Sequence, residues 1–231
     1  TPDIPQFNTA PVIAPDGKTM YYLSTRHGYP PAVYEMDLAT RRSRRLWGLG
    51  RTAIENIPMG NFAYLSRVMD ISRDGSRLVF AGTRNHRDGL YFYDTRSRRL
   101  ERRELPGFQN VAQPAFSPDG RQVAFSGMKD SFTDVYSYDL ASGQAAQLTA
   151  DPEDDQMPYF TPDGKAIVYA SELRDALDPA RKGRRLLRLD LADRSVTRLE
   201  DVGGESRDPV ASADGRRILT VAIVTALSTA D

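Results

Sequence analysis

The segment Phe116-Ser-Pro-Asp-Gly-Arg-Gln-Val-Ala-Phe-Ser126 joins a tight-turn signal to a short apolar run. In this signal Pro favours the first corner of a type I turn, Asp suits the second, and Gly takes the left-handed conformation that closes a hairpin. Versions of the same four-residue phrase occur five times, with their aspartates at Asp16, Asp74, Asp119, Asp163 and Asp214. Successive aspartates lie 44 to 58 residues apart, which is the period of a propeller blade.

Each turn is followed by further strand signals. An apolar run such as Val123-Ala-Phe125 comes first, and a β-rich segment ending in Asp follows; these aspartates are Asp37, Asp94, Asp139 and Asp190. Their repetition indicates carboxylates that accept backbone N–H groups in a turn rather than a catalytic set. A polar hairpin and a weak outer strand complete the unit. The sequence therefore predicts an all-β fold, a β-propeller with four-stranded antiparallel blades.

The repeats fill the chain, so we expect a single β-propeller domain over residues 1–231. It contains about four and a half blades, near residues 9–46, 67–100, 112–149 and 156–199, with a partial blade at 207–224. The last strand, Ile218–Val224, then lacks outer neighbours, which predicts oligomerisation or pairing with another segment. Residues 1–20 show no signal-peptide pattern, and we expect the chain to be a piece of a longer protein.

Composition narrows the functional classes. The 231 residues include 31 basic and 31 acidic side chains and no cysteine, so disulfides, a thiolate nucleophile and a strong overall field toward nucleic acid are excluded. No apolar stretch is long enough to span a bilayer. No nucleophile elbow, zinc helix or phosphate-binding glycine loop is present. We therefore expect no catalysis and no cofactor from these residues.

Propeller geometry sorts the connections onto two faces. The Asp-Gly turns and the hairpins between third and fourth strands lie on one face, called here the turn face. The links between blades and the loops between second and third strands lie on the other, the mouth face, together with two long insertions at Trp47–Ser66 and Glu172–Arg185. Binding residues concentrate on such loops. The five near-identical turns of the turn face are expected to offer little that distinguishes one partner from another.

Polar residues precede each inner strand and point toward the mouth of the axial channel; they include Asn8, Arg67, Gln113, Gln156, Arg207 and Asp208. Alternatively, these groups hydrogen-bond one another and channel water. His27 and His86 lie in loops on the same face, but no third ligand accompanies them, so no metal is predicted there. The acidic run Asp151–Asp155 leaves two alternatives open, calcium coordination or a solvated link.

The segments Phe116–Ser126, Val135-Tyr-Ser-Tyr-Asp-Leu140, Gln147-Leu-Thr149, Asp151–Gly164 and Ser24-Thr-Arg-His-Gly28 resemble the repeat of TolB-type β-propellers. The resemblance implies a non-catalytic module in the periplasm or cell envelope, with a protein or peptide partner docked at the channel mouth. Its best contact candidates are Arg67, Gln113, Gln156, Arg207 and Asp208, with Arg67 and Arg207 as anchors.

The same repeat also occurs in propellers fused to prolyl-oligopeptidase-type hydrolases. The alternative function is therefore a propeller domain of a longer hydrolase that gates or orients substrate. TolB-like propellers usually have six blades. The resemblance thus implies that an oligomer, a partner segment or fused domains complete the ring.

Overall fold

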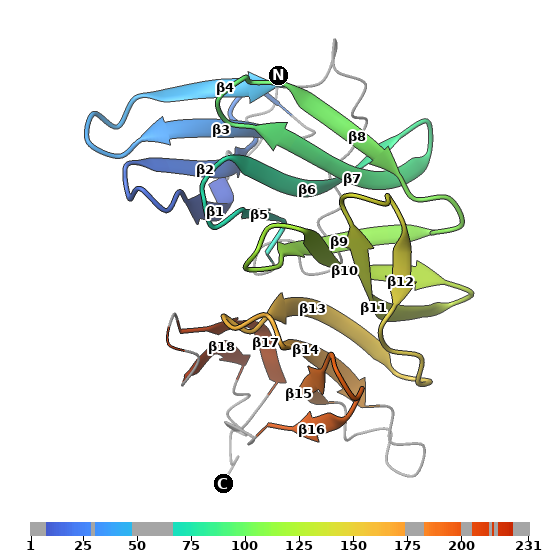
Figure 1. The fold of residues 1–231 in the computed structure, drawn as a ribbon. Coiled ribbons are helices and arrows are strands. Elements are labelled where there is room, and N and C mark those ends of the chain that lie inside the picture. Colours follow the sequence, from blue (N-terminus) through green and yellow to red (C-terminus); the bar gives the residue numbers. More distant parts are fainter. Residues whose placement is uncertain are drawn as a thin grey trace, which may run out of the picture.

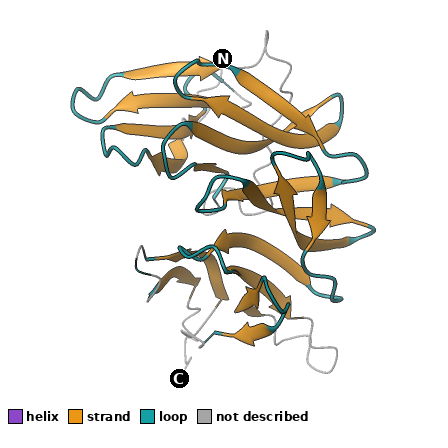
Figure 2. Cartoon of the chain, in the orientation of Figure 1, coloured by secondary structure: helices purple, strands orange, loops and turns teal. Residues whose placement is uncertain are grey.

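The computed structural model describes residues 8–28, 31–47, 67–173, 183–199, 205–212, 214 and 217–223. These residues form 18 strands in four antiparallel sheets of four strands and one sheet of two. Figure 2 shows strands and loops throughout the described part of the chain. No helix long and apolar enough to cross a membrane occurs in these ranges. The predicted all-β propeller with four-stranded antiparallel blades is confirmed.

Each blade runs from an inner to an outer strand in sequence order. Blade 1 contains β1 (Asn8–Ile13), β2 (Thr19–Ser24), β3 (Ala32–Asp37) and β4 (Ser43–Trp47), and blade 2 contains β5 (Met69–Ile71), β6 (Arg77–Arg84), β7 (Arg87–Asp94) and β8 (Leu100–Glu104). Blade 3 contains β9 (Asn110–Phe116), β10 (Gln122–Lys129), β11 (Phe132–Asp139) and β12 (Ala145–Gln147), and blade 4 contains β13 (Asp154–Phe160), β14 (Ala166–Leu173), β15 (Gly183–Asp190) and β16 (Val196–Arg198). The two-stranded sheet contains β17 (Glu205–Ala211) and β18 (Ile218–Ile223).

The Asp-Gly turns have the predicted chemistry. In blade 2 the Gly75 N–H donates to the Ser72 carbonyl over 2.8 Å, and Gly75 has a φ of +71°, where a glycine is favoured. The Asp74 carboxylate accepts from the Ser72 hydroxyl at 2.6 Å and from the Ser76 N–H at 3.0 Å. These hydrogen bonds, led by that from Ser72, lower the pKa of Asp74 to about 2. Equivalent turns close at Gly17, Gly120 and Gly164.

The repeated Asp at the end of each third strand also has the predicted structural role. Asp94 accepts the Ser97 N–H at 2.6 Å, and Asp139 accepts the Ser142 N–H at 2.7 Å. Hydrogen bonds from the turn backbone are the main cause that lowers the pKa of both carboxyls. These carboxylates therefore stabilise the turns between third and fourth strands.

The hydrophobic core lies between neighbouring blades. Leu78, Val79, Phe80 and Ala81 of β6 are each at most 1% exposed, because alternate residues pack on the sheets to either side. In blade 3 the Phe125 ring stacks on Tyr136 with centroids 5.6 Å apart. The continuous apolar runs of the sequence are therefore strands covered on both faces.

A bulge at an X-Pro step interrupts most inner strands, a feature that the sequence analysis missed. Ala10, Gln113 and Met157 have φ of 52°, 54° and 59°, and the strand register shifts at each of them. A proline follows every one, and Asp208-Pro209 occupies the same place in β17, whose register also shifts. Bulges are among the few places in a sheet that tolerate Pro. The X-Pro pair that recurs before four of the five Asp-Gly phrases was the available signal.

Blade 1 and the two-stranded sheet lie at opposite ends of the blade series, in blue and red in Figure 1. Apolar side chains are exposed at both ends: Ile13 is 58% exposed and Leu219 is 76% exposed. This exposure is what an incomplete ring would produce. Oligomerisation or pairing of the β18 edge with another segment stays a prediction.

Candidate partner-binding site at the channel mouth

The inner strands of successive blades pack against one another, with β5 beside β9 and β9 beside β13, and β13 beside β17. Asn8 is exposed at the mouth end of β1, where it pairs with Ser24 at the end of β2. The loops that carry His27 and His86 follow β2 and β6, so they lie on the same face. The structure thus brings Asn8 and both histidines to the mouth face of their blades.

Arg67 reaches from blade 2 to blade 4. Its guanidinium donates to the Pro158 carbonyl in the bulge of β13, and it lies over the Tyr159 ring, 5.3 Å from the centroid. A guanidinium over an aromatic face is attracted by the ring quadrupole. Arg67 is half-buried. It therefore joins two blades that are not neighbours and also presents charge inside the channel.

Asp70 accompanies Arg67 on the inner strand of blade 2. Its carboxylate accepts the Phe116 N–H of β9 at 2.8 Å. Desolvation raises the pKa of Asp70, while the charge of Arg67 and the Phe116 hydrogen bond oppose this rise. Asp70 was absent from the sequence-based candidates because the repeat gives no counterpart at its position. Through these contacts, the charged side chains of Arg67 and Asp70 join blade 2 to blades 3 and 4.

Gln113 is engaged in the contact between blades 3 and 4. Its side-chain oxygen accepts from the Ser126 hydroxyl at 2.7 Å and from the Met157 N–H at 3.0 Å. This oxygen satisfies the backbone group that the bulge at Met157 turns away from its own sheet. Gln113 is thus engaged by Ser126 and by the backbone of β13, and not by another of the predicted mouth residues. Gln156 is half-buried, and within the described ranges its side chain makes no hydrogen bond.

His27 packs against an aromatic pair in blade 1. Its Nδ1 contacts the Tyr34 hydroxyl, and its ring is stacked on Tyr34 at 6.0 Å. The Arg26 guanidinium lies over the ring of the same Tyr34 and donates to the Tyr22 hydroxyl at 3.1 Å. His86 is exposed in the hairpin of blade 2. No group of three or more His, Asp or Glu that could hold a metal ion occurs among the residues that the structure describes.

The structure describes the remaining predicted contact residues only in part. Arg207 and Asp208 lie in β17, where Arg207 pairs with Val221, and their side chains lie outside the described set. The insertion at Trp47–Ser66 falls almost entirely outside the described residues, as does most of Glu172–Arg185. The geometry of the mouth therefore rests on blades 1 to 4.

A buried carboxylate lies behind the mouth, in the link between blades 3 and 4. Asp155 is 0% exposed, and neither of its carboxylate oxygens accepts a hydrogen bond from the described residues. The two hydroxyls beside it also contact other carboxylates: Ser171 donates to Glu153 at 3.0 Å, and Thr149 donates to Asp134 at 3.4 Å. Burial is the main cause that raises the pKa of Asp155 to about 7; the Ser171 and Thr149 hydroxyls oppose this rise, and the charges of Asp151 and Asp134 add to it. The solvated-link interpretation is wrong for this residue.

The family model of the TolB beta propeller domain matches residues 62–226, which is more than half of the chain. The chain belongs to the TolB β-propeller family. This result confirms the resemblance that the repeats indicated. TolB-type propellers share the blade pattern described above, so family membership and fold agree.

Curated relatives match this TolB-type chain over different lengths. An uncharacterized protein of Agrobacterium fabrum is 25% identical over 220 residues, which cover 94% of the chain and 66% of that protein. A Tol-Pal system protein TolB of Francisella tularensis is 33% identical over 60 residues, which cover 26% of the chain and 14% of that protein. The chain thus spans less than two thirds of the length of these curated relatives.

Solved structures share the fold. TolB of Acinetobacter baumannii superposes with a TM-score of 0.70 at 21% identity, covering 92% of this chain and 48% of that one. The β-propeller domain of the Trilobed protease of Pyrococcus furiosus gives a TM-score of 0.61 at 16% identity, covering 96% of this chain and 65% of that one. Propellers of both TolB and proteases therefore share this blade architecture.

Proposed function

We propose that this chain is a non-catalytic TolB-type propeller module that binds a protein or peptide partner at its channel mouth in the bacterial cell envelope. Family membership supports the TolB-type assignment. Relatives named as Tol-Pal system proteins support a periplasmic location and a partner from that system. The proposed contacts are the anchors Arg67 and Arg207, together with Asn8, His27, His86, Gln156 and Asp208.

One observation carries the proposal: the inner strands bulge at X-Pro steps, and side chains from two other blades hold the bulge of β13. Gln113 and Arg67 satisfy the backbone groups of β13 at this point, which fixes the channel wall. A rigid wall with exposed residues at its rim is pre-organised, so the site itself loses less conformational entropy when a partner docks. The half-buried Gln156 offers both a donor and an acceptor there.

Pal is the first partner to test, because the curated relatives belong by name to the Tol-Pal system. Purified full-length protein should bind purified Pal from the same organism in isothermal titration calorimetry. Saturable binding that a Gln156→Ala variant weakens would support the proposal. Saturable binding that mouth-face variants leave unchanged would contradict the assigned face, and no binding would contradict Pal as the partner.

The second candidate function is a propeller domain that gates substrate for a hydrolase. A relative named as an uncharacterized peptidase of Bacillus subtilis, 24% identical over 176 residues, favours it; the match covers 75% of this chain and 23% of that protein. The full-length gene product should then hydrolyse peptides, with activity in a segment outside this chain. Failure of the full-length product to hydrolyse any peptide in a broad fluorogenic library would exclude this alternative.

A further inference from the structure

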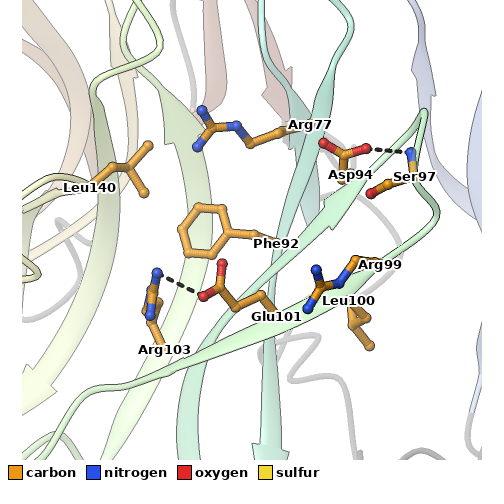
Figure 3. A pocket seen from close by; sticks show the side chains of 9 residues that line it. All are labelled: Arg77, Phe92, Asp94, Ser97, Arg99, Leu100, Glu101, Arg103 and Leu140. Atoms are coloured by element: carbon orange, nitrogen blue, oxygen red, sulfur yellow. Dashed lines mark hydrogen bonds and ion pairs between the residues drawn. The ribbon is translucent and has the colours of Figure 1, made fainter.

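A groove of about 470 Å³ opens on the turn face between blades 2 and 3, whereas the proposed partner-binding site lies on the mouth face. Figure 3 shows Phe92 at its centre, with Arg77 on one side, Glu101 and Arg103 on the other, and Leu140 beyond. Leu100 adds a further apolar side chain, and Arg99 a further guanidinium. Phe92 is 5% exposed, and Leu100 and Leu140 are half-buried, so the groove has a narrow apolar floor with a charged rim.

The positive charge of this groove is only partly used. Arg103 pairs with Glu101 at 2.8 Å, and Asp94 is occupied by the N–H groups of Ser97 and Arg96. Arg77 pairs with Asp94 in the strand register, and its charge is one of the lesser causes that lower the pKa of Asp94. No hydrogen bond or ion pair engages the guanidinium of Arg77 or Arg99 within the part of the chain that the structure describes, and both residues are exposed. Three arginines against two carboxylates leave the groove net positive.

The groove is specific to blade 2, in contrast to the expectation that the turn face is uniform. The position of Phe92, two residues before the Asp that ends the third strand, holds Glu35 in blade 1, Ser137 in blade 3 and Arg188 in blade 4. The position of Arg77 holds Thr19, Gln122 and Ala166 in blades 1, 3 and 4. Blades 1, 3 and 4 therefore lack both the aromatic floor and the arginine at the position of Arg77.

The neighbouring groove between blades 1 and 2 differs in how its charges are paired. It is smaller, about 270 Å³, and Glu35 and Arg44 line it. These two side chains form an ion pair at 2.7 Å, so their charges are mutually satisfied. An anionic ligand gains little from such a site, whereas the two guanidiniums beside Phe92 still have donors to offer.

We propose that the groove of Arg77, Phe92, Arg99 and Leu140 binds an extended acidic segment of a partner protein. Carboxylates of the segment would engage Arg77 and Arg99, and an aliphatic or aromatic side chain between them would cover Phe92 and Leu140. The size of the groove suits a few residues of peptide. This second surface is independent of the mouth-face proposal, and it would let one propeller hold two partners at once.

Fluorescence polarisation with the labelled peptide Ac-Glu-Leu-Asp-Leu-Glu-NH2 and the full chain tests this proposal. The Arg77→Ala/Arg99→Ala variant should weaken binding by about tenfold or more. The control Arg42→Ala/Arg121→Ala removes two exposed arginines of the turn face outside the groove, Arg42 being the counterpart of Arg99 in blade 1; it should bind normally.

Two further probes separate the sources of binding. A peptide with Ser in place of both Leu should bind more weakly, because it leaves the floor uncovered. Inorganic phosphate at millimolar concentration should not displace the acidic peptide. The proposal is overturned if the peptide does not bind, if both double variants weaken it equally, if the Ser-substituted peptide binds equally well, or if phosphate displaces it.

Discussion

Replacing the buried Asp155 with Asn should stabilise the protein at pH 8 and do so far less at pH 5. The pKa of this carboxyl is about 7 in the folded protein and about 4 in an unfolded chain. As pH rises from about 4 to 7, the unfolded state releases its proton first, so folding stability falls. Asn resembles the protonated acid in shape and carries no charge, so it removes this loss. We expect the variant to gain on the order of 2 kcal/mol more at pH 8 than at pH 5.

Chemical denaturation at both pH values measures this difference. Several charged and polar groups surround Asp155 or contact its neighbours, and they contribute to the same pH dependence. They are Asp134, Asp151, Glu153, Asp154, Tyr169, Ser171 and Arg185. The exposed Asp130 is the matched control, and Asp130→Asn should show no such dependence on pH. An equal effect of Asp155→Asn at pH 5 and pH 8 would show that this carboxylate is not held with a raised pKa.

Replacing Arg67 and Arg207 together with Ala should weaken the binding of Pal by about 2 kcal/mol, or about thirtyfold, if they are the anchors of the interface. A guanidinium binds a carboxylate or a carbonyl in fixed geometry, which alanine cannot replace. Calorimetry of the full-length variant measures the change. The control Arg121→Ala/Arg217→Ala removes two exposed arginines of the turn face and should leave this affinity unchanged.

The structure indicates that the Arg67→Ala/Arg207→Ala variant should also be less stable. From the sequence alone, Arg67 and Arg207 are expected to contact only the partner, so that their loss would leave stability nearly unchanged. In the structure, however, Arg67 donates to the Pro158 carbonyl and packs on Tyr159. Arg67→Ala alone should therefore lower the free energy of unfolding by about 1 kcal/mol. Comparing the binding of Arg207→Ala with its own free energy of unfolding separates the two effects for the second arginine. Normal binding by both single variants, with loss in the turn-face control, would reverse the assignment of faces.

The repeat made the blades predictable because it is local. Each Asp-Gly phrase specifies a hairpin within a few residues, as Ser72, Asp74 and Gly75 do through their own hydrogen bonds. The role of Asp94 in its turn could be predicted for the same reason. Period, turn chemistry and apolar runs all act over short separations, so a single sequence contains them in full.

The contacts that shape the site could not be predicted, because they join distant parts of the chain. Arg67 and Pro158 are 91 residues apart, and only the packing of blades 2 and 4 brings them together. Asp155 belongs to an acidic run that looks solvated, yet blades 3 and 4 enclose it completely. Arg77, Phe92 and Arg99 lie on three consecutive segments of one blade, and only the sheet places them around one groove.

Site-specific photo-crosslinking in the native host tests most directly whether the mouth face holds the partner. A benzophenone amino acid would replace the exposed Asn8 at the mouth, or the exposed Lys165 on the turn face of blade 4, in the full-length protein. The account predicts a discrete crosslinked product from the Asn8 position, recognised by an antibody against Pal, and none from the Lys165 position. A product from Lys165 with none from Asn8 would contradict it.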